Sequence, residues 1–184
     1  MNVKPSELPE VLILTPKRFD DARGFFSETY NERLWQELGI DLRFVQDNHS
    51  RSAEPGTVRG LHYQLPPHAQ DKLVRVTRGA ILDVAVDIRV GSPTFGRHVS
   101  IVISAAEWNQ ILVPAGFAHG YATLEPDTEV FYKTTDFYAP DFERAIRWND
   151  PAIGIEWGLA HGQAVVSDRD AQAPLLAAAV DLFD

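Results

Sequence analysis

Apolar and polar residues alternate in short runs along much of the chain. From Leu82 to Arg89, leucine, valine and isoleucine alternate with aspartate, alanine and arginine, which is the period of a half-buried strand. Residues 98–103 continue this alternation, and residues 129–134 are rich in aromatic and β-branched residues, which favour strands. The pattern therefore predicts strands at 82–89, 98–103 and 129–134.

Turn-forming residues separate these runs at short intervals. Glycine or proline marks each turn, at residues 55–56, 78–79, 91–93, 114–116 and 149–151. Many short strands at this spacing are typical of an antiparallel sandwich or barrel. The predicted architecture is therefore mostly β.

Helical patterns are sparse. Residues 31–38 predict one short helix, with Asn31 as its N-cap and Gly39 just beyond its end. Residues 174–182 predict a second, with Pro174 in its first turn and an alanine-rich body. Without an internal repeat or a linker, we expect a single domain over residues 1–184. Within it we expect an N-terminal arm of about 1–50, a β-barrel core of about 51–150 and a C-terminal segment of about 151–184.

Composition and charge exclude several classes of protein. The chain of 184 residues has no cysteine, which excludes a thiol nucleophile, a disulfide framework and a zinc–thiolate site. A net charge of -9 is opposite in sign to what a non-specific binder of nucleic acid or of an anionic membrane needs. No apolar run approaches the roughly 20 residues of a membrane span, and the N-terminus has no apolar signal-peptide core. We expect a soluble cytoplasmic protein.

Two of the six histidines have distinctive surroundings. His62 lies in the segment Arg-Gly-Leu-His-Tyr-Gln at 59–64, and His119 ends the segment Pro-Ala-Gly-Phe-Ala-His at 114–119. The pattern Pro-x-Gly-x-x-His resembles the second signature of the cupin superfamily of small β-barrels, and the segment around His62 falls where the first signature would. The resemblance implies a cupin-type jelly-roll barrel of antiparallel strands with a few short helices.

The metal ligands of metal-binding cupins are replaced in this chain. Those proteins place a second histidine two residues after the first and an acid a few residues on, whereas this chain has Gln64 and, in the expected region of the acid, Lys72. An ammonium group repels a divalent cation and offers no lone pair, so we predict no metal site. Lys72 has two interpretations: a lysine that keeps a sheet edge soluble, or a desolvated ammonium that stabilises an oxyanion.

Longer motifs follow one another in a fixed order from residue 19 to residue 176. They are Phe-x-Asp-x-Arg-Gly-Phe-Phe-x-Glu at 19–28, Phe-Val-Gln-Asp-Asn-His-Ser at 44–50, Arg-Gly-Leu-His at 59–62, Lys-Leu-Val-Arg at 72–75, Asp-Val-Ala-Val-Asp-Ile-Arg at 83–89, Ser-Pro-Thr-Phe-Gly at 92–96, Pro-x-Gly-Phe-Ala-His-Gly at 114–120, Trp-Asn-Asp-Pro at 148–151 and Ser-Asp-Arg-Asp-Ala-x-Ala-Pro-Leu-Leu at 167–176. Together they resemble the dTDP-4-dehydrorhamnose 3,5-epimerase family over nearly the whole chain.

The resemblance implies a role for each matching residue. His62 falls at the general base, Asp170 at the carboxylate that orients it, Tyr132 at the general acid and Lys72 at the reacting centre as a donor to the enolate. The positions that bind the nucleotide diphosphate or the sugar are occupied by Arg23, Glu28, Gln46, Asn48, Arg59, His119, Glu143 and Arg169, and Tyr138 falls where an aromatic ring stacks on thymine.

The residues alone leave some of these roles open. Sequence does not show whether Asp168 or Asp170 reaches His62. Without the resemblance, Tyr132 on a strand is also compatible with a packed aromatic residue whose hydroxyl meets water.

The implied reaction is the epimerisation of dTDP-4-dehydro-6-deoxyglucose at carbons 3 and 5, which gives dTDP-4-dehydrorhamnose for dTDP-rhamnose biosynthesis. An imidazole, with an ordinary pKa of about 6.5, can remove the weakly acidic proton next to a ketone near pH 7. No Gly-x-Gly-x-x-Gly fingerprint is present, in line with a reaction that needs no cofactor. The resemblance also implies a homodimer, and leaves open which subunit supplies Arg23 and Glu28.

Two other functions remain as alternatives. The nearer is an epimerase that acts at carbon 3 or carbon 5 only, or on another dTDP-4-keto-6-deoxy sugar. The more distant is a non-catalytic or metal-dependent sugar-binding cupin, against which the joint presence of His62, Lys72, Tyr132 and Asp170 argues.

Overall fold

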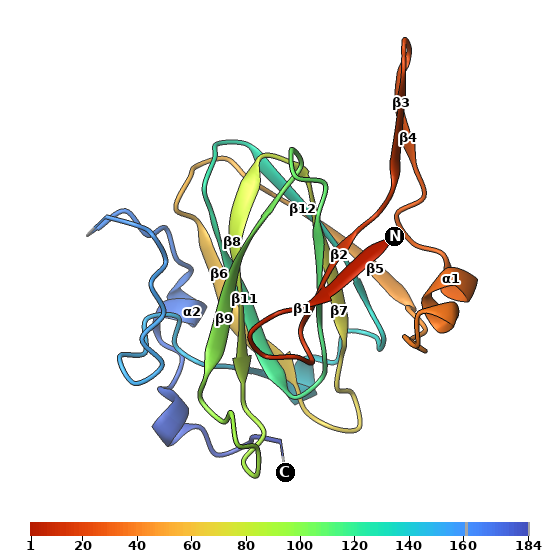
Figure 1. The fold of residues 1–184 in the computed structure, drawn as a ribbon. Coiled ribbons are helices and arrows are strands. Elements are labelled where there is room, and N and C mark those ends of the chain that lie inside the picture. Colours follow the sequence, from red (N-terminus) through yellow and green to blue (C-terminus); the bar gives the residue numbers. More distant parts are fainter. Residues whose placement is uncertain (161, 184) are drawn as a thin grey trace.

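Two antiparallel sheets face each other and form a flattened barrel (Figure 1). The computed structural model describes residues 1–160 and 162–183. The six-stranded sheet has, in spatial order, β1 (Asn2–Pro5), β2 (Leu12–Thr15), β10 (Gln110–Val113), β7 (Lys72–Arg78), β12 (Thr128–Thr134) and β5 (Gln46–Ser52). The five-stranded sheet has β13 (Glu143–Ala145), β6 (Val58–Gln64), β11 (Phe117–Thr123), β8 (Ala80–Asp87) and β9 (His98–Ser104).

The strands predicted from alternation are confirmed. Residues 82–89 fall mainly in β8, residues 98–103 in β9 and residues 129–134 in β12. In β8 one set of alternate side chains, including Ile81 and Ala85, packs between the sheets. The other set, Val84 and Val86, packs against the C-terminal part of the chain, so both faces of this strand are buried.

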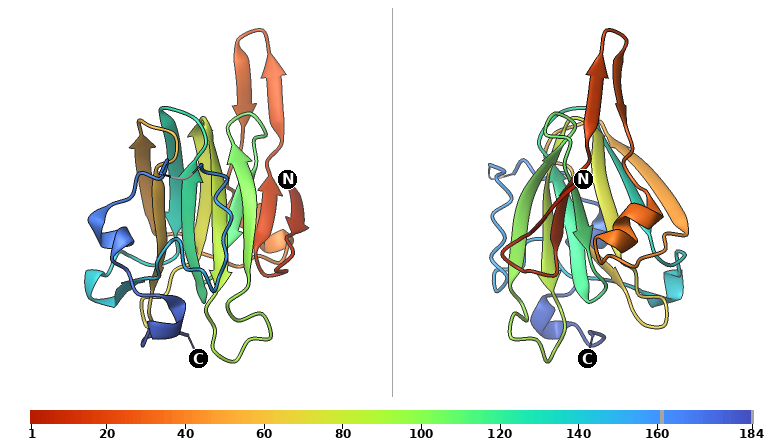
Figure 2. Two further views of the ribbon diagram at one scale, coloured as in Figure 1. Left: turned by 90° about the vertical axis from the view of Figure 1, so that its left-hand side faces the viewer. Right: turned by 45° about the vertical axis from the view of Figure 1, so that its right-hand side comes forward.

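The barrel extends beyond residues 51–150. Strands β1, β2 and β5 come from the segment expected to form an arm, and all three belong to the six-stranded sheet. What projects from the barrel is one hairpin, β3 (Arg18–Asp21) and β4 (Gly24–Ser27), which pair with each other in a separate two-stranded sheet. Figure 2 shows this hairpin extending past the ends of the barrel strands. Helix α1 (Glu32–Glu37) follows, capped by Asn31 as predicted.

The C-terminal segment covers the outer face of the five-stranded sheet (Figure 2). It contains two short helices, α2 (Asp168–Ala171) and the 3-10 turn η2 (Leu176–Ala178), and a further 3-10 turn, η1 (Pro140–Phe142), precedes β13. The helix predicted at 174–182 is wrong, because tertiary bonds hold that backbone. Pro174 O accepts the Arg147 N–H (2.8 Å), and the Leu176 N–H donates to Asp150 Oδ2 (2.7 Å). No helix in the described part of the chain is long and apolar enough to cross a membrane.

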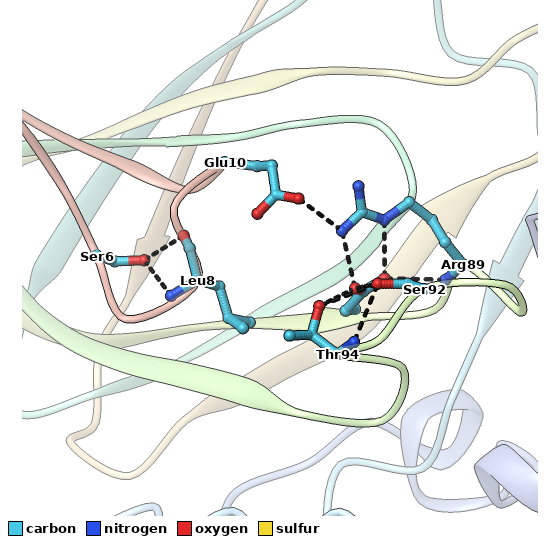
Figure 3. Close-up of polar contacts among 7 residues, drawn as sticks. Ser6, Leu8, Glu10, Arg89, Ser92 and Thr94 are labelled. Atoms are coloured by element: carbon cyan, nitrogen blue, oxygen red, sulfur yellow. Dashed lines mark hydrogen bonds and ion pairs between the residues drawn. The ribbon is translucent and has the colours of Figure 1, made fainter.

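A polar network ties the end of β8 to the N-terminal turn (Figure 3). The buried Asp87 carboxylate accepts bonds from Arg89 Nη2 (2.8 Å), the Ser92 hydroxyl (2.5 Å) and the Thr94 hydroxyl (2.6 Å), and Arg89 also contacts Glu10 (3.1 Å). Burial alone would raise the pKa of Asp87, but these bonds outweigh burial and lower it. The network fixes the loop between β8 and β9, and none of its residues lines the cavity described below.

Candidate active site

A cavity between the two sheets has two lobes that meet at His62, Lys72 and Tyr132. The lobe of about 560 Å³, called the arginine lobe here, is also lined by Ser50, Arg59, His119, Tyr121, Arg169 and Asp170. The lobe of about 300 Å³, the glutamine lobe, is also lined by Gln46, Asn48, Gln64, Gln70, Tyr138 and Glu143. The structure thus brings together eleven of the thirteen site residues named from sequence, all except Arg23 and Glu28.

The partly exposed His62 pairs with the buried Asp170. The distance from His62 Nε2 to Asp170 Oδ1 is 2.7 Å, and the Gly60 N–H donates to Asp170 Oδ2 (3.2 Å). The side chain of Ser167 caps α2 and accepts the Asp170 N–H (3.1 Å), which aims the carboxylate at β6. Asp170 is 4% exposed whereas Asp168 is exposed, so the ambiguity between the two is resolved in favour of Asp170.

The protonation states of this pair suit His62 to act as a base. Burial would raise the pKa of Asp170, but the hydrogen bond from His62, the bond from Gly60 and the charge of Arg169 together lower it. An ionised Asp170 accepts a hydrogen bond from His62 Nε2, which fixes the tautomer of the imidazole ring. Nδ1 of His62 is then the nitrogen that can take up a proton.

A close approach between β6 and β11 shapes the backbone next to His62. Gly60 has a φ of +120°, and a Cβ there would lie 2.5 Å from Gly120 Cα and 2.7 Å from His119 O. The pairing of the two strands shifts register between His119 and Tyr121, just past the position where His119 pairs with His62. Only glycine fits this approach, which sets His62 and His119 side by side on the inner face of the sheet.

Lys72 reaches into the cavity from the centre of the six-stranded sheet. Strand β7 lies between β10 and β12, so Lys72 is not a solubilising residue at a sheet edge. Its Nζ donates to the main-chain oxygen of His62 (3.2 Å). Burial lowers the pKa of Lys72 to about 8, opposed by the negative charges of Glu143 and Asp83. The oxyanion interpretation is the one that its position fits.

Tyr132 faces His62 from the other sheet. It lies on β12 of the six-stranded sheet, whereas His62 lies on β6 of the five-stranded sheet, and both line the two lobes. Burial, and next to it the charge of Glu143, raise the pKa of the Tyr132 phenol. Tyr132 therefore stays a neutral proton donor throughout the pH range in which the protein would work.

The mouth of the cavity carries an aromatic ring and an ion pair. Glu143 Oε2 accepts the Tyr138 hydroxyl (2.7 Å) and forms an ion pair with Arg169 Nη2 (2.7 Å). Burial would raise the pKa of Glu143, but these two contacts lower it overall. The Tyr138 N–H donates to Gln46 Oε1 (2.9 Å), and the ring is 54% exposed. An exposed ring held at both ends suits stacking on a flat ligand group.

The polar groups of Gln64 are already bound. Its Oε1 accepts the Ala139 N–H (2.9 Å) and its Nε2 donates to His68 O (2.7 Å). Within residues 1–160 and 162–183, no three histidine, aspartate or glutamate side chains are grouped so as to hold a metal ion. Gln64 instead holds the loops that carry Tyr138 and His68.

Arg23 and Glu28 lie on the projecting hairpin and the segment after it. Arg23 forms an ion pair with Asp21 (2.6 Å), and Glu28 accepts a bond from Asn31 (3.0 Å). Neither residue lines the cavity of its own chain. Aromatic side chains on the same hairpin are unusually exposed: Phe19 51%, Phe25 56% and Phe26 70%.

Sequence reasoning missed several residues in the cavity and directly behind its wall. The Ser50 and Tyr121 hydroxyls bond to each other across the two sheets (2.9 Å), and Asp83 Oδ1 and Oδ2 each lie 2.9 Å from His119 Nε2. A signal was present, since Ser50 follows Asn48 by two residues and Tyr121 follows His119 by two. In a strand, residues two apart point to the same face.

Comparisons with known proteins agree on one family. A sequence model described as dTDP-4-dehydrorhamnose 3,5-epimerase matches residues 5–178. The chain is 50% identical to a dTDP-4-dehydrorhamnose 3,5-epimerase of Sinorhizobium fredii over 92% of this chain and 86% of the relative. It is 47% identical to that of Escherichia coli over 92% and 91%.

Solved structures of a 3,5-epimerase and of a monoepimerase both superpose closely on this chain. A dTDP-6-deoxy-D-glucose-3,5-epimerase of Legionella pneumophila, in complex with dTDP-4-keto-L-rhamnose, superposes with a TM-score of 0.91 at 44% identity, covering 96% of this chain and 93% of that one. A 3′-monoepimerase of Streptomyces bikiniensis, in complex with dTDP-quinovose, superposes with a TM-score of 0.86 at 33% identity over 94% and 87%.

Proposed function

The chain belongs to the dTDP-4-dehydrorhamnose 3,5-epimerase family, and we propose how its residues carry out that reaction. The enzyme is an isomerase that inverts carbons 3 and 5 of dTDP-4-dehydro-6-deoxy-D-glucose and forms dTDP-4-dehydro-L-rhamnose, a step in dTDP-rhamnose biosynthesis. The observation that carries the mechanism is the placement of His62 and Tyr132 on opposite sheets of one cavity.

His62 is the base. Its Nδ1 takes the proton from the carbon next to the ketone, and the electron pair of that C–H bond moves onto the 4-keto oxygen to form an enolate. Asp170, bonded to Nε2 at 2.7 Å, stabilises the imidazolium that results. Base catalysis of this kind contributes about 10²- to 10⁴-fold.

Lys72 and Tyr132 complete the exchange of protons. The Lys72 ammonium donates to the enolate oxygen, a contact that is stronger in the enolate than in the ketone. Tyr132 then gives its phenolic proton to the carbon from the face opposite His62, and the centre is inverted. Proton exchange with water returns the imidazolium and the phenolate to their starting forms.

The remaining residues hold the nucleotide. The guanidinium groups of Arg59 and Arg169 line the arginine lobe and suit the diphosphate, which accepts bidentate bonds. Tyr138 at the mouth suits the thymine ring, and the amides of Gln46 and Asn48 suit polar groups of the substrate. We include a cytoplasmic location in the proposal, because a nucleotide diphosphate carries charges that are costly to move through a bilayer.

The active enzyme is proposed to be a homodimer in which the hairpin β3–β4 enters the partner's site. The support is that Arg23 and Glu28 lie outside their own cavity and that the hairpin exposes three phenylalanines, which a second subunit can cover. Mixing inactive Arg23→Ala and His62→Asn subunits tests this. If Arg23 serves the partner's site, half of the sites in each mixed dimer carry both changes and the other half carry neither, so activity should return to roughly a quarter of the wild-type value. Mixed dimers that stay inactive would contradict it.

Proton NMR of the reaction in deuterated water tests the reaction itself. Deuterium should enter at both carbon 3 and carbon 5, and the product should be dTDP-4-dehydro-L-rhamnose. The similarity to a 3′-monoepimerase keeps inversion at one carbon as the second candidate. Uptake confined to one carbon would establish that candidate and refute the first.

A further inference from the structure

A buried carboxylate, Asp83, lies beside the reacting centre. It is 0% exposed, on β8 of the five-stranded sheet. His119 Nε2 lies 2.9 Å from both of its oxygens, and in the described part of the chain no other side chain bonds to it. His119 in turn lines the arginine lobe together with Lys72.

The position of Asp83 in the strand makes its charge costly to bury. Its neighbours on the same inner face, Ile81 and Ala85, are apolar and belong to the core. Burying a carboxylate among such residues is costly unless a partner compensates for the lost water. Accordingly, burial raises the pKa of Asp83, opposed by His119 and then by Lys72. Lys72 and His119 are thus the groups whose charge or hydrogen bond stabilises the ionised form of Asp83.

The other acids around Lys72 have cations or bases of their own. Glu143 is paired with Arg169 at 2.7 Å, and Asp170 is bonded to His62 at 2.7 Å. The charged or titratable groups that line the cavity with Lys72 are Arg59, His62 and Tyr63 on β6, His119 and Tyr121 on β11, Tyr132 on β12, Tyr138 in the segment after β12, Glu143 on β13, and Arg169 and Asp170 on α2. Among these surroundings, Asp83 is the acid without an arginine or catalytic-base partner.

Lys72 is not locked in a direct ion pair. Its Nζ donates to the His62 main-chain oxygen, and within residues 1–160 and 162–183 no acid lies within ion-pair distance of it. A counter-charge at longer range stabilises the ammonium and leaves its other N–H groups available to a ligand. Asp83, beyond His119, meets this requirement.

We propose that Asp83 is a positioning residue for the epimerisation, which fixes the His119 imidazole against the cavity wall and adds to the negative charge of Glu143 in keeping Lys72 an ammonium ion. The proposal rests on the proposed function only in the use of Lys72 as the donor to the enolate. The electrostatic part, a link between Asp83 and the charge of Lys72, holds for the free protein.

The test measures the pKa of Lys72 directly. The chain has only four lysines, at positions 4, 17, 72 and 133, so selective ¹³Cε labelling gives four resolvable titrations, and Lys72→Arg identifies the signal of Lys72. In the native protein the pKa of Lys72 is about 8. Asp83→Asn keeps the size of the side chain and one acceptor for His119 but removes the negative charge. Because that charge opposes the effect of burial on Lys72, the pKa of Lys72 should fall by about one unit or more in the variant. Asp168→Asn, an exposed acid on α2, should leave the pKa unchanged.

Activity supplies the second readout. In Asp83→Asn the alkaline limb of the kcat profile should move to lower pH by the same amount as the Lys72 titration, with about fivefold lower kcat at pH 8 from the charge effect. Asp83→Glu, which keeps the charge, should restore the limb toward its wild-type position. A smaller uncharged variant, Asp83→Ser, serves if Asp83→Asn does not fold.

The outcomes separate the two proposals. An unchanged Lys72 titration in a folded, uncharged variant overturns the role of Asp83, and so does a failure of both uncharged variants to fold, which would make Asp83 a structural residue. A shifted titration with an unshifted alkaline limb supports the link between Asp83 and Lys72 while refuting Lys72 as the catalytic donor.

Discussion

Replacing Asp170 with asparagine should disable the base while preserving the fold. The wild-type carboxylate accepts from His62 Nε2 at 2.7 Å with one oxygen and from the Gly60 N–H at 3.2 Å with the other. An amide has one oxygen and one NH₂ group, and only the oxygen can accept a hydrogen bond. In either orientation of the asparagine, its NH₂ group therefore faces one of the two N–H donors, His62 Nε2 or the Gly60 main-chain nitrogen. The change therefore breaks one bond and removes the negative charge next to the imidazole.

The expected loss is large because the Asp170 side chain is buried and its charge is weakly screened. Asp170 is 4% exposed, and hydrogen bonds to ionised groups are about twice as strong as neutral ones. When a carboxylate with this role was replaced by asparagine in a serine-protease triad, kcat fell about 10⁴-fold. We expect a fall of about 10³- to 10⁴-fold in Asp170→Asn, equivalent to roughly 4 to 5.5 kcal/mol of activation free energy. KM should change little, because Asp170 acts through His62.

The assay is deuterium uptake and product formation by proton NMR, alongside thermal unfolding. Asp168→Asn is the matched control, since Asp168 lies on the same short helix but is exposed. It should keep near wild-type rates. Rates within tenfold of wild type in a folded Asp170→Asn enzyme would refute the assigned role of the carboxylate, and an equal loss in Asp168→Asn would point to the helix rather than to Asp170.

Three further predictions concern Tyr132, Lys72 and metals. Tyr132→Phe should retain deuterium exchange but lose inversion, most clearly at carbon 5, since His62 can return a solvent-derived proton to the same face; equal losses of both in the NMR assay would contradict this. Because the pKa of Lys72 is about 8 and its ammonium form is the active one, kcat should fall as pH rises through that value. Lys72→Met should cost about 10²- to 10³-fold and abolish that limb, which a pH–rate profile measures. Activity should survive prolonged treatment with a strong chelator, and loss with rescue by a divalent ion would disprove metal independence.

Local patterns predicted several of the strands and one helix, whereas the catalytic set came from the resemblance to a family. Alternation identifies β8, β9 and β12 because a strand buried on one or both faces repeats every two residues. Asn31 identifies the start of α1 because its side chain bonds within the first turn. The resemblance to a family then located the residues that line one cavity.

Long-range contacts decided what the sequence left open. Asp170 lies 108 residues from His62, and only the fold of the C-terminal segment brings it rather than Asp168 to the ring. The helix predicted from Pro174 failed because bonds to Arg147 and Asp150 outcompete a local preference. Asp83 looked like the polar member of an alternating strand, and its contact with His119 depends on the register of β8 against β11, which places Asp83 opposite Tyr121 and two positions from His119.

In the proposed mechanism His62 removes the protons at both carbons. The direct test is His62→Asn, followed by proton NMR with dTDP-4-dehydro-6-deoxyglucose in deuterated water and by circular dichroism to confirm the fold. Deuterium uptake at carbon 3 and at carbon 5 should fall together, by about 10²- to 10⁴-fold. Exchange near the wild-type rate at either carbon, in a folded variant, would contradict this mechanism and would require a second base.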